Sequence, residues 1–149
     1  SRSIQFTNMT IRDDNRKFIK ELPQELTLKV GGLSMRLVHG SPRRNNEYLY
    51  ADSPELEEVT KEITEDILVC GHTHIPYYQV VNGKHVVNVG SVGKPKHGNP
   101  NATYGVIKVE DGRVEVEIRE VRYDLERTAK AIEENVILPD EFAAMLRKG

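Results

Sequence analysis

The 149-residue sequence has a single cysteine, Cys70, so no disulfide can form within the chain. It has no run of apolar residues long enough to span a bilayer, and it shows no signal-peptide pattern. The net charge is only −2, with both signs interspersed, which argues against nucleic acid as a required partner. These absences exclude a disulfide scaffold and a membrane protein, and they predict a cytoplasmic location.

The remaining composition is typical of a soluble globular domain. Hydrophobic residues make up 38% of the chain and charged residues 30%, which argues against disorder. A length of 149 residues is enough for one domain with a real core, and no repeat or low-complexity tract divides it. We therefore expect residues 1–149 to form a single domain. Within it, residues 1–10 show no clear periodicity and are expected to form a mobile arm.

The most informative stretch is residues 67–74, which read ILVCGHTH. Its four apolar residues predict a short buried strand that ends at Gly71. His72 and His74 are two positions apart, so in extended backbone both imidazoles can face one site. Gly71 removes a Cβ where the strand must turn and a ligand must approach closely. A strand end with convergent histidines is typical of a metal or phosphate site in an α/β protein.

Two further predicted strands end in small and polar residues. Residues 33–38 run into the sequence HGSP, which begins with His39 and Gly40. Residues 86–89 run into the sequence GSVG, which contains Ser91. If the three strands lie side by side, their ends ring one crevice.

Local signals predict the other elements. Capping residues begin four expected helices, at Asp13, Ser53, Asp124 and Asp140. Glycine-containing pairs predict three hairpin turns, at Gly31-Gly32, Asn82-Gly83 and Asp111-Gly112. This order predicts a mostly antiparallel sheet with helices on one face.

These motifs resemble those of the calcineurin-like metallophosphoesterases, in particular the small bacterial and archaeal phosphodiesterases of that superfamily. Residues 71–74 match the family motif G-H-x-H, and His39 stands beside a glycine at a strand end, as in the family. Residues 88–95, NVGSVGKP, are similar to the family segment N-P-G-S-V-G-x-P, and residues 122–124 extend the likeness. The resemblance covers the chain from about His39 to its end.

The resemblance implies both a fold and a chemistry. The fold is α/β, and this chain is expected to supply one mostly antiparallel sheet of a four-layer αββα sandwich. The activity is phosphoester hydrolysis, with a phosphodiester as the expected substrate and a metal-bound hydroxide at a site with two divalent ions. By position, His74 binds the first ion, and His39 and His72 bind the second. Manganese is the expected metal, with iron, nickel, cobalt and zinc as alternatives.

The family motifs D-x-H, G-D and G-N-H-D are missing from the sequence. In the family they carry the aspartate and asparagine ligands and the histidine that protonates the leaving group. We therefore expect a carboxy-terminal half-domain, inactive alone and with weak or partial metal occupancy, because three neutral imidazoles do not offset two dications. Its exposed sheet is expected to associate with the missing half or with a second copy.

Five further residues are candidates for contact with the ligand histidines or the substrate. Asn88 and Ser91 are candidate hydrogen-bond partners of the histidines, although both also suit a tight glycine-rich turn. Arg43 is a candidate phosphate ligand, and the alternative is a solvated side chain in a polar loop. Gly40 and Gly71 complete the set.

Two other functions remain open at this point. The same fold can serve as a non-catalytic scaffold or protein-interaction module, but a scaffold has no reason to keep all three histidines. An unrelated mononuclear metal protein would use the same histidines. That alternative does not account for the glycine-serine segment at residues 90–93 or for the hairpins that follow it.

Overall fold

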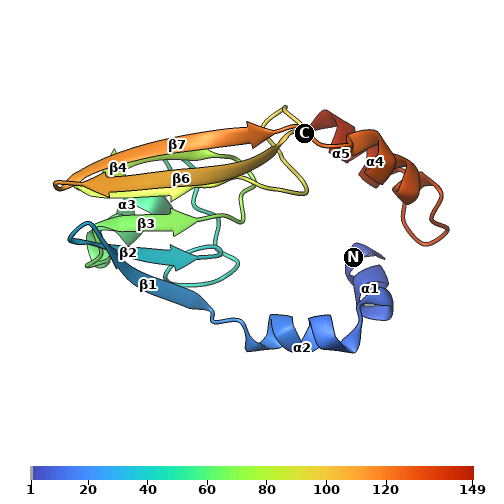
Figure 1. The fold of residues 1–149 in the computed structure, drawn as a ribbon, viewed down its shortest axis with the longest axis horizontal. Helices are drawn as coiled ribbons and strands as arrows, with labels where there is room; N and C mark the ends of the chain where they lie inside the picture. The colour runs from blue at the N-terminus through green and yellow to red at the C-terminus, as the bar shows by residue number, and fades with distance from the viewer. Residues whose placement is uncertain (1) are drawn as a thin grey trace.

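The computed structural model describes residues 2–149, and Ser1 lies outside the described residues. The helices are α1 (Arg2–Thr10), α2 (Asp13–Glu21), α3 (Pro54–Glu62), α4 (Leu125–Glu133) and α5 (Glu141–Lys148). The strands are β1 (Glu25–Val30), β2 (Leu33–Val38), β3 (Ile67–Cys70), β4 (Tyr77–Val81), β5 (Lys84–Asn88), β6 (Ala102–Glu110) and β7 (Arg113–Val121). The strands and α3 lie at one end of the molecule, and the other four helices lie at the opposite end (Figure 1). None of the described helices is long and apolar enough to cross a membrane.

Residues 2–10, which the sequence predicted to be part of a mobile arm, form the helix α1. The helix buries none of its residues. The hydroxyls of Thr7 and Thr10 donate hydrogen bonds to carbonyls one turn earlier, each at 2.9 Å. The helix is stabilised by local hydrogen bonds and not by burial. A helix of this kind needs no periodic apolar residues, which are the pattern that predicts helices from sequence.

The fold class is α/β, as expected, but the strands are divided between two sheets. The larger sheet has the strand order β1-β2-β3-β5-β4, and the smaller consists of β6 and β7. β2, β3 and β5 are parallel, and β1 and β4 are antiparallel strands added at the edges by hairpins. The centre of the sheet differs from the antiparallel expectation because parallel pairing joins strands that are distant in the chain.

Three hairpin turns lie where the sequence predicted them. Each has two consecutive residues with positive φ, with values of 56° and 86° at Gly31-Gly32, 50° and 74° at Asn82-Gly83, and 49° and 75° at Asp111-Gly112. Two positive φ values in a row are characteristic of a type I′ turn, whose twist matches that of the paired strands.

One face of the larger sheet is covered by α3. Ser53 caps the helix by accepting a hydrogen bond from Leu56 N at 3.3 Å, and Pro54 lies in the first turn. The helix and this face of the sheet together bury Leu49, Leu56, Val59, Ile63, Leu68, Cys70 and Val86. Burial raises the pKa of the Cys70 thiol to about 11, so this cysteine is an inert core residue, as the sequence predicted.

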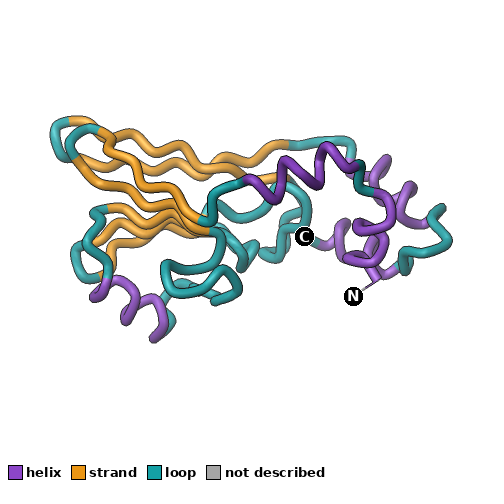
Figure 2. The backbone as a smooth tube through the Cα atoms, turned by 90° about the horizontal axis from the view of Figure 1, so that it is seen from below, coloured by secondary structure: helices purple, strands orange, loops and turns teal. Residues whose placement is uncertain are grey.

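The opposite face of the larger sheet carries the β6–β7 hairpin. An added Cβ at Gly105 on β6 would come within 3.0 Å of Val89 Cγ1, just past β5. The missing side chain lets the two sheets approach closely at this point. At the other end of β6, an added Cβ at Gly31 would lie 2.6 Å from Val109 O. Figure 2 shows α3 on the side of the strands away from this long hairpin.

The hairpin is two strands wide and leaves apolar side chains exposed at both edges of the face that it covers. Leu26 and Leu28 on β1, and Tyr78 and Val80 on β4, are all exposed. Strand register places these residues on the same face as Val87, which lies beneath Gly105. The sequence analysis expected an exposed sheet; the hairpin covers its centre, and these apolar side chains are exposed at the two edges.

The layering predicts unequal costs for two leucine substitutions. Leu68→Ala is expected to lower the free energy of unfolding by about 2–5 kcal/mol, because the fully buried side chain leaves a cavity beneath α3. Leu26→Ala, at the exposed edge of the same sheet, is expected to cost less than about 1 kcal/mol. Urea denaturation followed by circular dichroism measures both, and equal losses would contradict the layering.

Candidate metal centre

Two parallel strands end side by side in histidines. Just beyond the ends of β2 and β3, Gly71 N donates a hydrogen bond to His39 O at 2.9 Å. His39 Nε2 and His72 Nδ1 lie 3.0 Å apart, and the two ring planes meet at 67°. The parallel centre of the sheet thus brings together two of the three histidines that the sequence singled out.

His74 does not join this pair. The backbone φ is 63° at both His72 and His74, so the segment is left-handed and not extended as the sequence analysis assumed. His74 Nδ1 donates to Lys94 O at 2.6 Å, which leaves a free lone pair on Nε2. Within residues 2–149, no group of three or more histidine, cysteine or acidic side chains is placed to hold one ion. The motif is therefore not extended as expected, and His74 is not a third ligand to an ion held by His39 and His72.

Asn88 holds the left-handed turn in place. Non-glycine residues in this conformation cost about 1–3 kcal/mol each, so the surrounding structure must enforce it. The buried Asn88 side chain donates from Nδ2 to Gly71 O at 2.8 Å and to Thr73 Oγ1 at 3.0 Å. Its Oδ1 accepts from Gly90 N at 3.0 Å. Asn88 therefore supports the turn at residues 71–74 and the turn at Gly90. It does so through backbone groups and the Thr73 hydroxyl, and not through the predicted bond to an imidazole.

Thr73 is a supporting residue that the sequence analysis missed. Its side chain is fully buried, and its hydroxyl accepts from Asn88 Nδ2 and from Ile75 N, the latter at 3.1 Å. The signal was a small hydroxyl residue between two histidines, and its role became clear only with the position of Asn88.

Ser91 acts one step away from His74. Its Oγ accepts a hydrogen bond from Lys94 N at 3.0 Å and closes a turn. The same Lys94 presents its carbonyl to His74, and Lys96 N donates to His74 O at 3.2 Å. Ser91 therefore contacts the backbone of Lys94, and not a histidine as the sequence analysis expected. The hydrogen bond from His74 to Lys94 O fixes the ring orientation and tautomer of His74.

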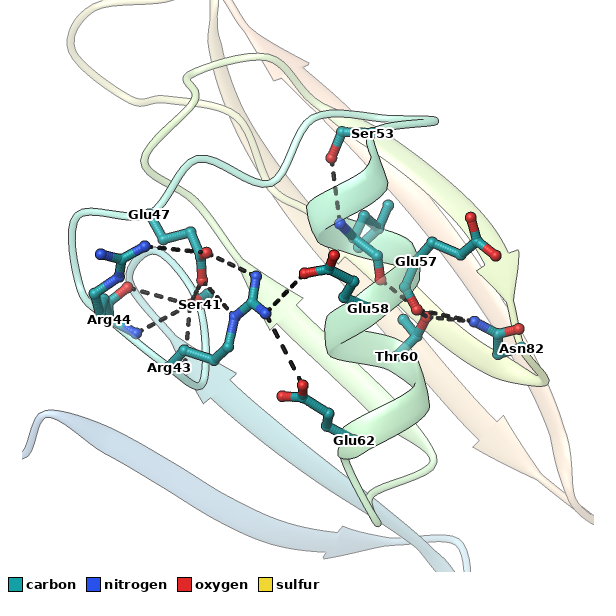
Figure 3. A network of polar contacts seen from close by, with 11 residues as sticks. Ser41, Arg43, Arg44, Glu47, Ser53, Glu57, Glu58, Thr60, Glu62 and Asn82 are labelled. Carbon is teal, nitrogen blue, oxygen red and sulfur yellow. Dashed lines mark hydrogen bonds and ion pairs between the residues drawn. The ribbon is translucent and has the colours of Figure 1, made fainter.

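Arg43 is occupied by carboxylates, so the prediction that it binds phosphate is corrected. Its guanidinium donates to both oxygens of Glu47, at 2.8 and 3.1 Å, and to Glu58 at 3.1 Å (Figure 3). Glu47 is buried and also accepts from Ser41 Oγ. Hydrogen bonds from Arg43 lower the pKa of Glu47, and hydrogen bonds to Glu47 and Glu58 raise the pKa of Arg43. The network fixes the loop that follows His39.

The two candidate glycines differ in what they require. An added Cβ at Gly40 would lie 2.5 Å from Asn45 O and 2.8 Å from Glu47 O, so the loop packs directly against this backbone. An added Cβ at Gly71 would meet, among the described residues, His39 O at 3.6 Å, which is an ordinary contact. The protein's own packing therefore explains Gly40 but not Gly71.

The His39–His72 pair has the chemistry of two ligands to one ion. Nitrogens bound to one metal at about 2.1 Å lie about 3.0–3.4 Å apart at octahedral or tetrahedral angles, and the observed separation is 3.0 Å. Burial lowers the pKa of His72, and the nearby His39 and His74 act in the same direction, although the Asn46 backbone opposes them. The lowered pKa favours the neutral imidazole, which is the form that binds a metal. Its Nε2 is buried and has no hydrogen-bond partner in the described part of the chain. Because no carboxylate of the described residues completes a three-ligand group with them, the two imidazoles fit part of a metal site.

The chain matches the calcineurin-like phosphoesterase superfamily domain over residues 7–112. The protein belongs to this family. The resemblance seen in its motifs is thus confirmed, and membership of this family implies divalent metal ions.

Two solved structures share the fold of this chain. The metallophosphoesterase from Sphaerobacter thermophilus superposes with a TM-score of 0.82 at 23% identity, over 97% of this chain and 64% of that one. The hypothetical protein PH1004 from Pyrococcus horikoshii OT3 gives a TM-score of 0.80 at 24% identity, over 91% of this chain and 54% of that one.

The relatives found by sequence are longer than this chain. The uncharacterized protein MJ0912 of Methanocaldococcus jannaschii is 27% identical over 89% of this chain and 59% of its own length. A probable metallophosphoesterase of Mycoplasma pneumoniae is 31% identical over 56% of this chain and 52% of its own length. The chain thus spans little more than half the length of these two relatives.

Loss of the Asn88 amide is expected to destabilise the site and the fold together. Asn88→Ala leaves Gly71 O, Thr73 Oγ1 and Gly90 N without their buried partner, so the free energy of unfolding should fall by about 2–4 kcal/mol. Asn45→Ala, at an exposed loop position, serves as the matched control in the same urea titration. A loss no greater than that of the control would show that Asn88 does not hold the turns.

The Glu47 carboxylate is expected to make stability depend on pH. Hydrogen bonds from Arg43 lower its pKa in the folded protein, so the unfolded chain binds more protons in acid. Its contribution is complete above the unfolded pKa of about 4.3 and is lost as the pH falls through the folded value. The free energy of unfolding between about pH 7 and pH 3 should therefore fall less steeply in Glu47→Gln than in the wild type.

The exposed Glu55 on α3 provides a variant that also loses one negative charge. Glu55→Gln tests whether any effect of Glu47→Gln comes from net charge alone. Equal slopes in Glu47→Gln and the wild type would contradict the role given to the buried carboxylate.

Proposed function

We propose that this chain supplies the histidine ligands of a metal-dependent phosphoesterase that hydrolyses phosphodiesters at a site with two divalent ions. The observation that carries the proposal is the 3.0 Å approach of His39 Nε2 and His72 Nδ1 at the joined ends of β2 and β3. Family membership supports phosphoesters as the broad class of substrate. In this proposal the carboxylate ligands come from a segment outside the sequence, in keeping with the greater length of the matched relatives.

Each histidine has a defined proton arrangement in the proposed site. His74 keeps its proton on Nδ1, bonded to Lys94 O, and offers Nε2 to the first ion. His39 and His72 offer Nε2 and Nδ1 to the second ion, so each carries its proton on the other ring nitrogen. If their 3.0 Å contact is a hydrogen bond, one of the two facing nitrogens carries a proton. That proton must leave before both nitrogens can bind an ion.

The supporting residues orient the ligands and leave the chemistry to the ions. Divalent ions at such a site act as Lewis acids that activate water and offset charge on the phosphoryl oxygens. Asn88 fixes the left-handed turn that aims His72, and Lys94 O fixes the tautomer of His74. Imidazole suits manganese, iron, cobalt, nickel and zinc, and manganese is the ion that we would test first.

Metal binding can be tested on the 149-residue chain without turnover. Paramagnetic Mn²⁺ is expected to broaden the ring proton signals of His39 and His72 before those of His85, whose Nδ1 pairs with the Tyr78 hydroxyl at 2.8 Å. His72→Ala removes one ligand and should abolish the broadening at His39, whereas His85→Ala should leave it unchanged. Equal broadening at all five histidines of the sequence would contradict the site.

Hydrolysis of an aryl phosphodiester tests the catalytic part of the proposal. With Mn²⁺ present, the chain alone is expected to turn over no faster than His74→Ala, because carboxylate ligands are missing from both. Joined to an amino-terminal half that carries the family's aspartates, the wild type should hydrolyse the ester. Removing a residue that only hydrogen-bonds a metal ligand lowers activity by about 10–100-fold. Removing the ligand itself, in His74→Ala, should therefore lower the rate of hydrolysis by more than about 100-fold.

Two outcomes would contradict this expectation. Turnover by the chain alone, abolished in His74→Ala, would show that the histidines suffice. Metal binding without hydrolysis in the completed protein would favour a scaffold over an enzyme.

A further inference from the structure

A row of three aromatic rings leads away from the proposed metal ligands. The Tyr48 ring lies against His72, with centroids 4.2 Å apart and planes at 36°. Tyr50 stacks on Tyr48, with centroids 5.7 Å apart and planes at 3°. The two tyrosines are 43% and 44% exposed, although large aromatic side chains gain free energy from burial. The site therefore has an exposed, parallel pair of aromatic rings directly beside a ligand histidine.

The tyrosines are held in this position by their neighbours. Residues alternate along the segment, so that Glu47 and Leu49 are buried while Tyr48 and Tyr50 face outward. The Glu47 side chain is fixed by Arg43, as Figure 3 shows, and the Leu49 carbonyl accepts from the Tyr77 hydroxyl at 2.9 Å. A ligand that stacks here does not pay to order the segment, because these buried contacts have already ordered it.

The hydroxyl groups of the pair take no part in holding it. Among the described residues, neither the Tyr48 nor the Tyr50 hydroxyl makes a hydrogen bond. Position comes from the backbone and from ring contact. The exposed part of the two rings is therefore the surface that is offered to a ligand.

We propose that Tyr48 and Tyr50 form a stacking platform that binds a planar aromatic group of the phosphoester substrate, such as a nucleobase or an aryl ring. The inference rests on the proposed function, since it names the class of substrate for the same site. Stacking on aromatic side chains tolerates different bases because each has a π-face. Tyr48, the first ring of the platform, lies directly against His72. An aromatic group that is a few bonds from the phosphorus of a metal-bound substrate can therefore reach the platform.

Ligand binding to the 149-residue chain tests the platform without turnover. The probes are adenosine 5′-monophosphate, 4-nitrophenyl phosphate and ribose 5-phosphate, each titrated in the presence of Mg²⁺, with the ring signals of labelled tyrosine as the readout. The two aromatic probes are expected to shift the Tyr48 and Tyr50 signals, and ribose 5-phosphate is not. Tyr48→Leu should weaken binding of adenosine monophosphate by about 5- to 100-fold, and Tyr48→Phe should retain it.

Tyr104 provides a matched control, because it is 42% exposed and lies on β6, outside the row of rings. Tyr104→Leu should leave the affinity for all three probes unchanged. Equal affinity for adenosine monophosphate and ribose 5-phosphate, with no effect of Tyr48→Leu, would overturn the platform. Binding of adenosine monophosphate but not of the nitrophenyl ester would identify the aromatic group as a nucleobase, whereas binding of both would extend it to aryl rings.

Mn²⁺ broadening at His39 and His72, measured on the same preparations, separates this inference from the proposed function. Broadening without any tyrosine response would refute the platform and leave the metal site standing. A tyrosine response without broadening would support the platform and refute the histidine ligands.

Discussion

In the larger sheet β2, β3 and β5 run parallel, with Leu37 opposite Val69 and Cys70 opposite Asn88. Parallel strands in register end at the same edge, so the segments that follow them leave the sheet at one level. His39, the histidine motif that begins at Gly71 and the turn at Gly90 are therefore neighbours. If any one of these strands were reversed, its functional segment would lie at the opposite edge, near the hairpin turns.

Hydrogen bonds to backbone groups then turn this proximity into defined positions. Asn88 joins two of the strand ends, and the Lys94 carbonyl orients His74 from the third loop. The buried Glu47 and Arg43 fix the loop after His39 in the same way. Asn88 and Glu47 are buried, where an unpaired polar atom is costly, so their bonds restrict the adjoining loops to one conformation.

The resulting site has two parts with different chemistry. In the two proposals, the histidine pair would offer lone pairs to a metal ion, and the adjacent tyrosines would offer ring surface to an organic group. Among the described residues no carboxylate completes a three-ligand group with the histidine pair, and the matched relative MJ0912 is longer than this chain. A phosphoesterase site completed by another segment would account for a ligand set of imidazoles alone and for the apolar side chains left exposed beside the β6–β7 hairpin.

The sequence by itself determined the features that depend on neighbouring residues. Glycine-containing pairs determined the type I′ turns, Ser53 determined the start of α3, and the motifs around His39 and His72 indicated the family. The tertiary structure decided which partners these residues meet. It placed His39 beside His72, gave Arg43 to Glu47 and put Tyr48 against an imidazole. Turns and caps form within a few residues, whereas these contacts depend on parallel strand pairing and loop closure between distant segments, which leave no local pattern in the sequence.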